Sequence, residues 1–138
     1  MAQKNIHGDW SMSFENRILK SEVRGATNAE AARIWLKEAE EYVLSSPEGE
    51  TTPWVVLNDC RQWNTTALDA WQDHNAVIDW ARSHHCVWFA TIFSKKIQRF
   101  AADNGFQSQQ ILHFYFDYDE AHQACLDKLR EAHHSSKT

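Results

Sequence analysis

The sequence predicts a single α/β domain: a mainly parallel five-stranded sheet with an N-terminal antiparallel hairpin strand, and four helices. Three observations lead to this fold class. The chain has 138 residues, the usual length of one domain. Residues 54–57 and 86–93 are apolar at nearly every position, as strands buried on both faces are. Segments with helical periodicity alternate with the later strands, and strands separated by helices form parallel sheets through right-handed crossovers.

The N-terminal third of the chain predicts a β-hairpin followed by a helix. Apolar and polar residues alternate over residues 10–14, and a second short strand-like run follows at residues 18–23. Asn28 is a suitable N-cap for a helix over residues 29–44. The apolar stripe of that helix consists of Ala32, Trp35, Ala39 and Val43. We therefore expect the helix to pack on the sheet and the first strand to lie at a sheet edge.

The middle of the chain predicts two further helices. Thr66 is a suitable N-cap for a helix that ends near His84. The residues that share one face of this helix are Leu68, Trp71, Asn75 and Ile78. A short helix follows the strand at residues 86–93, and its inward residues are expected to be Ile97, Phe100 and Ala101. Gly105 then stands just beyond the helix end, where a left-handed backbone favours glycine.

The C-terminal segment predicts a fifth strand at residues 111–118 and a fourth helix capped by Asp119. The inward residues of this helix are Ala121, Ala124, Cys125 and Leu129. From about His133 to residue 138 we expect a frayed tail. The element order is therefore β-β-α-β-α-β-α-β-α, and residues 1–138 form one domain.

The carboxyl ends of the strands are the expected position of a functional site, because α/β proteins usually bind their ligands at that edge of the sheet. The loops expected there are residues 24–28, 58–66, 94–96 and 117–119. The candidate site residues on these loops are Asn58, Asp59, Arg61, Trp63, Thr65, Thr66, Ser94, Lys95 and Lys96.

Charge and composition exclude several classes of partner and setting. The chain has 14 Lys and Arg against 19 Asp and Glu, a net charge of -5, which disfavours nucleic-acid binding. No apolar run approaches the ~18 residues that a membrane span needs. Three widely spaced cysteines and a polar N-terminus predict a reduced, cytoplasmic protein.

The chemistry-bearing residues do not form an established cofactor, metal or catalytic motif. Gly25 is the only glycine in the predicted strand-to-helix loops, so a glycine-rich phosphate cradle is absent. The run His84-His85-Cys86 lacks a second ligand pair at zinc-site spacing. Cys60 has no recognisable activating group. We therefore expect no cofactor, no metal and no enzymatic activity.

Two features of the predicted edge suit a partner, although each also has a simpler explanation. Lys95 and Lys96 open the short helix and, with Arg61 and Arg99, could form a basic patch for an acidic partner or a phosphate; alternatively, they are solvated. Trp63 lies in a polar segment, where it either folds back as a lid or is exposed to a partner.

Three segments that together span nearly the whole chain resemble one family. They are the hairpin of residues 10–25 leading into a helix, Val55-Val56-Leu57-Asn58-Asp59 followed by Asn64-Thr65-Thr66-Ala67-Leu68, and Ile92-Phe93-Ser94-Lys95-Lys96-Ile97-Gln98-Arg99-Phe100 ending in Asn104-Gly105-Phe106. This pattern resembles the STAS family, with the anti-sigma factor antagonist-like fold also called SpoIIAA-like, and its lipid-binding STAS/SEC14-like relatives. The resemblance implies a SpoIIAA-like fold for the chain.

The resemblance also implies a phosphoacceptor. In the family, the segment after the central strand usually reads Asp-Ser-Ser-Gly, and a partner anti-sigma kinase phosphorylates its first Ser. Thr65 stands at that position, whereas Asn64 replaces the acid and Ala67 replaces the glycine. These departures weaken the implied phosphoswitch. Judged from chemistry alone, a helix cap explains Thr66 better than a phosphate site does.

The function predicted first is a nonenzymatic regulatory or protein-interaction domain, whose partner is an anti-sigma-like kinase or another regulator. The alternative is a carrier of a small lipophilic ligand, since the many Trp, Phe and Leu residues suit either an apolar pocket or a tightly packed core. An enzyme is the third reading, supported only by Cys60 and the histidines. The sequence does not distinguish a monomer from a homodimer.

Overall fold

The computed structural model describes residues 8–47, 51–66, 70–107 and 110–136. In this part of the chain the elements are β1 (Asp9–Glu15), β2 (Ile18–Thr27), α1 (Ala29–Leu44), β3 (Trp54–Thr66), α2 (Trp71–Ser83), β4 (Cys86–Ile92), α3 (Lys96–Gly105), β5 (Leu112–Tyr115) and α4 (Tyr118–Ser136). The five strands form one sheet in the order β1-β2-β3-β4-β5. Only β1 and β2 pair antiparallel, and the other pairs are parallel. The predicted fold class and element order are confirmed.

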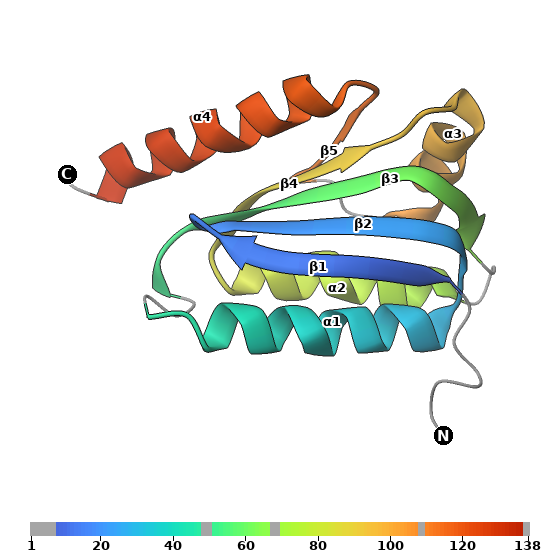
Figure 1. The fold of residues 1–138 in the computed structure, drawn as a ribbon, viewed down its shortest axis with the longest axis horizontal. Helices are drawn as coiled ribbons and strands as arrows, with labels where there is room; N and C mark the ends of the chain where they lie inside the picture. The colour runs from blue at the N-terminus through green and yellow to red at the C-terminus, as the bar shows by residue number, and fades with distance from the viewer. Residues whose placement is uncertain (1–7, 48–50, 67–69, 108–109, 137–138) are drawn as a thin grey trace.

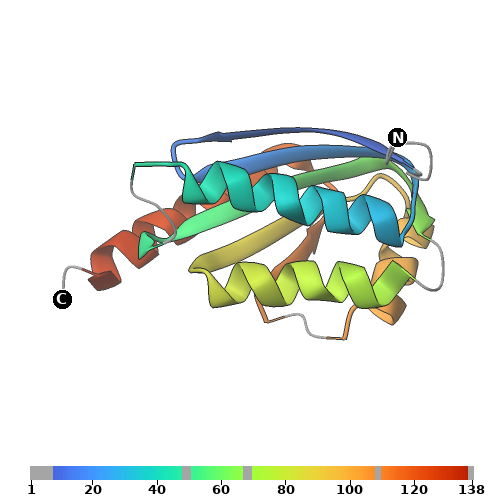
Figure 2. The ribbon, with the colours of Figure 1, turned by 90° about the horizontal axis from the view of Figure 1, so that it is seen from below.

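The helices lie in layers that follow from the strand order. From β2 onward, each connection adds the next strand on the same side of the previous one. Right-handed connections that all advance in this direction place their helices on the same face of the sheet. Helices α1 and α2 accordingly lie side by side on one face, whereas α4 crosses the other and α3 lies at one end of the sheet (Figures 1 and 2). None of the helices in the described part of the chain is long and apolar enough to cross a membrane.

The hairpin forms the sheet edge, as predicted. Asn16 and Arg17 both have positive φ, at 54° and 66°, which is the geometry of the two-residue turn that matches strand twist. Alternate residues of β1 are exposed, and these include Ser11 and Ser13.

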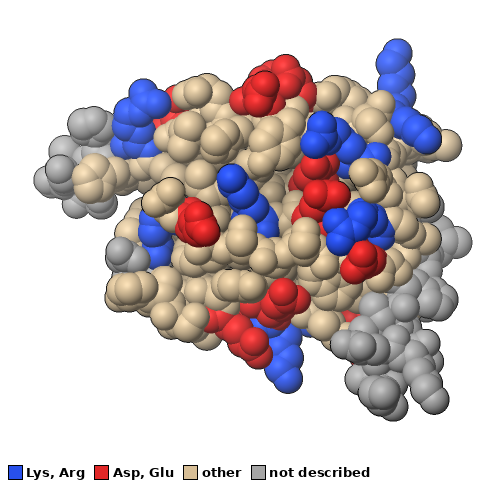
Figure 3. All heavy atoms as spheres, viewed as in Figure 1, with Lys and Arg blue, Asp and Glu red and all other residues tan. Residues whose placement is uncertain are grey.

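Basic and acidic side chains are interspersed over the surface seen in Figure 3, so this face carries no field of one sign.

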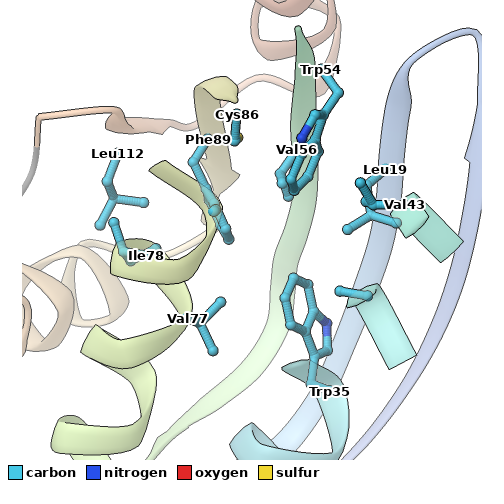
Figure 4. Close-up of a cluster of buried hydrophobic side chains, with 12 residues drawn as sticks. Leu19, Trp35, Val43, Trp54, Val56, Val77, Ile78, Cys86, Phe89 and Leu112 are labelled. Carbon is cyan, nitrogen blue, oxygen red and sulfur yellow. The ribbon is translucent and has the colours of Figure 1, made fainter. Parts of the chain in front are cut away.

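The sheet core lies on both faces of the central strands. Val56 and Trp54 point toward α1 and α2, where they pack with Trp35, Val43, Ile78 and Phe89 (Figure 4). Val55 and Leu57, from the alternate positions, pack under α4 with Ala121 and Cys125. All four of these β3 side chains are at most 1% exposed, which confirms the prediction of a doubly buried central strand.

The largest difference from the prediction is the length of β3. The sequence predicts a strand over residues 54–57 and a loop over residues 58–66, but β3 continues to Thr66. The reason is pairing: β2 runs parallel beside it, with Glu22 opposite Asp59 and Thr27 opposite Thr66, and register shifts accommodate the extra residues. Backbone hydrogen bonds to a neighbouring strand therefore outweigh the polar character of this segment.

Thr66 is consequently not the N-cap of α2. It ends β3, and its hydroxyl donates a 2.8 Å hydrogen bond to the Thr27 carbonyl. Helix α2 begins at Trp71, and its N-cap, Ala70, has no side-chain capping bond. Leu68, which was predicted to lie on this helix, falls outside the described residues.

The last helix also differs from the prediction at both ends. The carboxylate of Asp117 accepts a 3.0 Å hydrogen bond from the Asp119 N–H, so the cap lies two residues before the predicted Asp119. Strand β5 is shorter than predicted and ends at Tyr115. Helix α4 continues through Ser136, and the frayed tail predicted from His133 is therefore wrong up to that residue.

Gly105 has a different role from the one predicted. It is the last residue of α3, and it is not among the described residues with positive φ. A Cβ built on it would overlap the indole ring of Trp71. The glycine is therefore required by close packing between α3 and α2, and not by a left-handed backbone.

Candidate functional site

The predicted site residues lie in β3 and at the start of α3, which lies at one end of the sheet (Figure 1). Six of them lie in β3, namely Asn58, Asp59, Arg61, Trp63, Thr65 and Thr66. The other three, Ser94, Lys95 and Lys96, lie at the start of α3. The sequence assigned a loop to residues 58–66, whereas the structure has a strand there.

One side chain that the prediction missed holds this end together. Gln98 is 6% exposed, and its Oε1 accepts 2.8 Å hydrogen bonds from the backbone N–H groups of Ser94 and Lys95. Its Nε2 donates to the Trp63 carbonyl at 2.6 Å and to the Cys60 carbonyl at 3.2 Å. Gln98 thus ties the start of α3 to β3. A Gln three residues after a helix N-cap is the signal that could have identified it.

This polar anchor reverses the expected orientation of α3. Gln98 and Ala102 are buried against the sheet end, and the predicted inward residues Ile97 and Phe100 point outward instead. Ile97 is 73% exposed and Phe100 is 69% exposed, which makes them the two most exposed of the large apolar side chains in the described residues. The prediction of an inward Ile97 and Phe100 is wrong, and the outer face of α3 carries these two large apolar side chains among charged ones.

Arg61 contacts its own neighbours and does not add to a basic patch. Its guanidinium donates to both carboxylate oxygens of Asp59, at 2.9 and 2.7 Å, and lies 5.4 Å from the Tyr118 ring centroid. Burial alone would raise the pKa of the Asp59 carboxyl, but the hydrogen bonds from the Arg61 side chain and backbone outweigh it and hold that pKa below its usual value. The Ser94 hydroxyl donates a 2.8 Å hydrogen bond to the Arg61 carbonyl.

Arg99, the other arginine of the predicted patch, is also in an ion pair, whereas no ion pair is recorded for Lys95 or Lys96 among the described residues. Arg99 lies 3.4 Å from Asp103, one helical turn away. Lys95 and Lys96 are exposed beside the outer face of α3. Basic side chains project from the molecule at the corner where α3 lies (Figure 3).

Trp63 is neither a lid nor an exposed contact residue. It is 6% exposed, and its ring centroid lies 5.9 Å from that of Phe93. Its indole N–H donates a 3.1 Å hydrogen bond to the Thr27 hydroxyl. Trp63 is therefore a core residue at the sheet end. The side chain of Thr65 lies outside the described residues.

A cavity of about 90 Å³ lies between the sheet, α1 and α2. Its walls are mostly apolar, and the polar side chains that reach it include Asn58, Thr91 and His74. Cys60 also lines it, and burial raises the pKa of this thiol far above its ordinary value, which removes the reactive thiolate. Among residues 8–47, 51–66, 70–107 and 110–136, no group of three or more His, Cys, Asp or Glu side chains could hold a metal ion.

His74 also lines the cavity, and it titrates closer to neutral pH than Cys60 does. Its Nε2 lies within hydrogen-bond distance, 3.2 Å, of the Thr27 hydroxyl, which also accepts a hydrogen bond from the Trp63 indole. Burial lowers the pKa of His74 to about 4, although the nearby Asp73 opposes this shift. The imidazole is therefore neutral at pH 7.

We expect His74 to make the folded state sensitive to mild acid. The unfolded chain protonates this ring near pH 6.5, whereas the folded chain protonates it only at about pH 4, so stability is lost as the pH falls between these values. The loss attributable to His74 is about 3 kcal/mol. Chemical unfolding at pH 7.5 and pH 4 should show a larger loss for the wild type than for His74→Gln.

The comparisons with known proteins establish the fold. No protein-family model matches the sequence, and no curated protein matches it. A DUF3478-family protein from Shewanella loihica PV-4, described as uncharacterized and SpoIIAA-like in fold, has a TM-score of 0.58 and 18% identity, covering 88% of this chain and 96% of that one. An anti-sigma factor antagonist from Mycobacterium paratuberculosis has a TM-score of 0.56 and 14% identity, covering 87% and 95%. The chain thus has the SpoIIAA-like fold that its sequence resemblance implied.

Proposed function

We propose that this chain is a nonenzymatic regulatory domain of the STAS type that binds a protein partner through the outer face of α3. The observation that carries the proposal is the exposure of Ile97 and Phe100 on a helix whose polar Gln98 is buried. Exposed apolar side chains that lie together commonly mark interaction surfaces. The solved structure of an anti-sigma factor antagonist with this fold supports a protein partner by analogy.

The chemistry of this surface defines the kind of partner. Ile97 and Phe100 lie one turn apart, so they can enter one apolar recess as a central anchor. Lys95 and Lys96 lie beside them and favour acidic residues on the partner, chiefly by accelerating association. We infer a partner protein that presents an apolar recess bordered by Asp or Glu. An anti-sigma-like kinase or another regulator would be such a protein.

The buried cysteines support both a nonenzymatic role and a reducing cytoplasmic setting. Cys60, Cys86 and Cys125 are all free and buried. Burial raises the pKa of Cys86 to about 12, and that of Cys125 likewise. Protonated, buried thiols are poor nucleophiles, and free thiols persist in reducing compartments.

A lipid carrier receives less support from the structure than a protein-binding domain does. The cavity under α1 and α2 has about 90 Å³, well below the ~300 Å³ at which pockets for drug-sized ligands begin. An acyl chain would need the two helices to separate from the sheet. Carriage of a small lipophilic ligand, the alternative function, is therefore not the function proposed for the chain.

The experiment compares the double variant Ile97→Ser/Phe100→Ser with Leu44→Ser, a control that removes another exposed apolar side chain, at the C-terminal end of α1. Proteins captured by the wild type from native cell extract are identified, purified and titrated against each variant by calorimetry. We expect the double variant to lose at least about 30-fold in affinity, because two anchors contribute ~1 kcal/mol or more each. Leu44→Ser should bind like the wild type. A purified partner that binds the double variant equally well refutes the proposal.

Two further arms of this titration test the remaining features. Lys95→Glu/Lys96→Glu should slow association and reverse its salt dependence. Thr65→Glu should weaken binding if Thr65 is the phosphoacceptor, because it adds negative charge near the acidic partner surface. If the wild type self-associates and the α3 double variant does not, this surface forms a homodimer. That result would contradict the proposal that the partner is a different protein.

A further inference from the structure

Strand β1 is an open edge of the sheet. It comes first in the sheet order and, in the described part of the chain, pairs with β2 alone (Figure 1). Proteins usually protect such an edge with lysine, proline, a bulge or a very short strand. β1 has seven residues without Lys or Pro, and its pairing with β2 is continuous from Asp9 to Glu15. The opposite edge differs, because β5 has only four residues and its Leu112 is 3% exposed.

The hairpin register determines which backbone groups of β1 face outward. Glu15 and Ile18 lie opposite each other across a two-residue turn, and such flanking residues exchange backbone hydrogen bonds. Every second pair of an antiparallel ladder does the same, so the residues between these pairs direct their N–H and C=O groups away from β2. These outward groups, which we call the β1 edge, belong to Trp10, Met12 and Phe14. The Tyr42 hydroxyl of α1 donates a 3.3 Å hydrogen bond to the Met12 carbonyl, in agreement with its outward direction.

Acidic side chains border the β1 edge. Glu15 is exposed at the end of the strand. On α1, the Glu38 carboxylate accepts a 3.0 Å hydrogen bond from the Trp10 indole N–H, and Glu41 is exposed one turn further along. The C-terminal half of α1 contains three glutamates against one basic residue, Lys37. No ion pair is recorded for Glu15, Glu38 or Glu41 among the described residues, so this border remains negative.

The basic side chains of the hairpin are engaged elsewhere or lie further in. Arg24 is shared between Asp9 and Glu22, at 3.0 and 3.1 Å. Arg17, beside the turn, donates hydrogen bonds to backbone carbonyls of the segment before β3. Lys20 is exposed, but it lies on β2, one strand in from the edge. A segment that approaches the β1 edge therefore meets mainly negative charge.

We propose that the β1 edge binds an extended, lysine- or arginine-rich segment of another protein, which joins the sheet as a sixth strand. Backbone hydrogen bonds to the outward groups of β1 provide the affinity, and contacts of basic side chains with the acidic border select the segment. A second copy of this chain fits less well, because two-fold pairing of β1 with itself would bring the same acidic borders together. The site does not involve α3 and does not depend on the partner proposed for that helix.

The experiment titrates three synthetic seven-residue peptides into the wild-type protein. The first alternates Lys and Thr, the second replaces each Thr of the first by Pro, and the third replaces each Lys of the first by Glu. Proline cannot donate a hydrogen bond to a strand, so the Lys-Pro peptide keeps the charge but cannot join the sheet. We expect the Lys-Thr peptide to bind at least about tenfold more tightly than either of the others, because only it combines the hydrogen bonds with the favourable charge.

Amide hydrogen exchange followed by NMR locates the bound peptide. A saturating concentration of the Lys-Thr peptide should slow the exchange of the outward amides of Trp10, Met12 and Phe14. The amides of Ser11 and Ser13 already bond to β2 and should change least.

Three variants separate the hydrogen bonds from the charge. Met12→Pro removes an outward N–H that β2 does not use, so the domain should fold and bind the Lys-Thr peptide at least about tenfold more weakly. Glu15→Gln removes one charge of the acidic border and should weaken binding about two- to fivefold. Glu120→Gln, the matched control, removes an exposed charge from α4 and should bind like the wild type.

Four results with the wild type would overturn the proposal. Equal affinity for the Lys-Thr and Lys-Pro peptides would show attraction by charge alone, and equal affinity for the Lys-Thr and Glu-Thr peptides would show no selection of basic segments. The third is the absence of binding at millimolar peptide. The fourth is protection of the outward amides that grows with protein concentration in the absence of peptide, which would assign the edge to a second copy. These tests remain decisive if Met12→Pro does not fold.

Discussion

Val56→Asp is expected to abolish folding. Val56 is 0% exposed in the middle of β3, between the neighbouring strands and under α1 and α2. An Asp side chain there would be a carboxyl group without a partner in an apolar core, which costs several kcal/mol beyond the lost packing. Because a domain of this size has only about 5–15 kcal/mol of stability, the folded state should no longer be populated. Amide NMR of the variant should show the narrow dispersion of an unfolded chain.

Ser13→Asp is the control for this prediction. Ser13 lies on the exposed side of the edge strand β1, so the same charge is introduced into the same sheet without burial. Its unfolding free energy should remain within about 0.5 kcal/mol of the wild-type value. A cooperatively folded Val56→Asp protein with wild-type stability would place Val56 outside the core.

Gly105→Ala should destabilise the domain, although alanine normally stabilises a helix. In an unhindered helix this change contributes roughly 0.5–1 kcal/mol of stability. At Gly105 the new Cβ would meet the Trp71 ring, which is itself packed against Trp63, Phe106 and His74. These three neighbours hold the ring in place, and overpacking of this kind costs about 1–3 kcal/mol. Denaturant unfolding measures both the sign and the size of the effect.

A double-mutant cycle with Trp71→Ala assigns the effect to this contact. If the Cβ acts through the Trp71 ring, Gly105→Ala should regain its ordinary stabilising sign once the ring is removed. A loss of stability that is the same with and without the Trp71 ring would mean that the backbone, and not the packing, requires glycine.

The parts of the fold that the sequence predicted are those determined by local patterns. The continuous apolar run of Val55, Val56 and Leu57 indicates a central strand from burial alone. The Asn28 side chain caps α1 as predicted, accepting a 3.0 Å hydrogen bond from the Ala31 N–H. Both signals are contained within a few neighbouring residues.

The parts that the sequence did not predict depend on contacts between distant residues. The polar run from Asn58 to Thr66 becomes a strand only because β2 extends beside it. The orientation of α3 depends on Gln98, whose acceptors on β3 lie 35 to 38 residues earlier in the chain. The spacing of Ile97 and Phe100 is the same for an inward or an outward apolar stripe, and the pattern alone therefore favours the commoner inward one. The residues predicted for the site lie in β3 and at the start of α3, but the exposed face of α3 was assigned incorrectly.

The central claim, that α3 presents Ile97 and Phe100 to solvent, is tested most directly by the unfolding free energy of Ile97→Ser/Phe100→Ser in the isolated protein. The structure predicts a change of no more than about 1 kcal/mol, as for two surface substitutions. Phe93→Ala is the buried reference, because Phe93 is 1% exposed and its truncation should cost ~3–5 kcal/mol. A loss in the α3 double variant as large as that of Phe93→Ala would contradict the claim and return both side chains to the core.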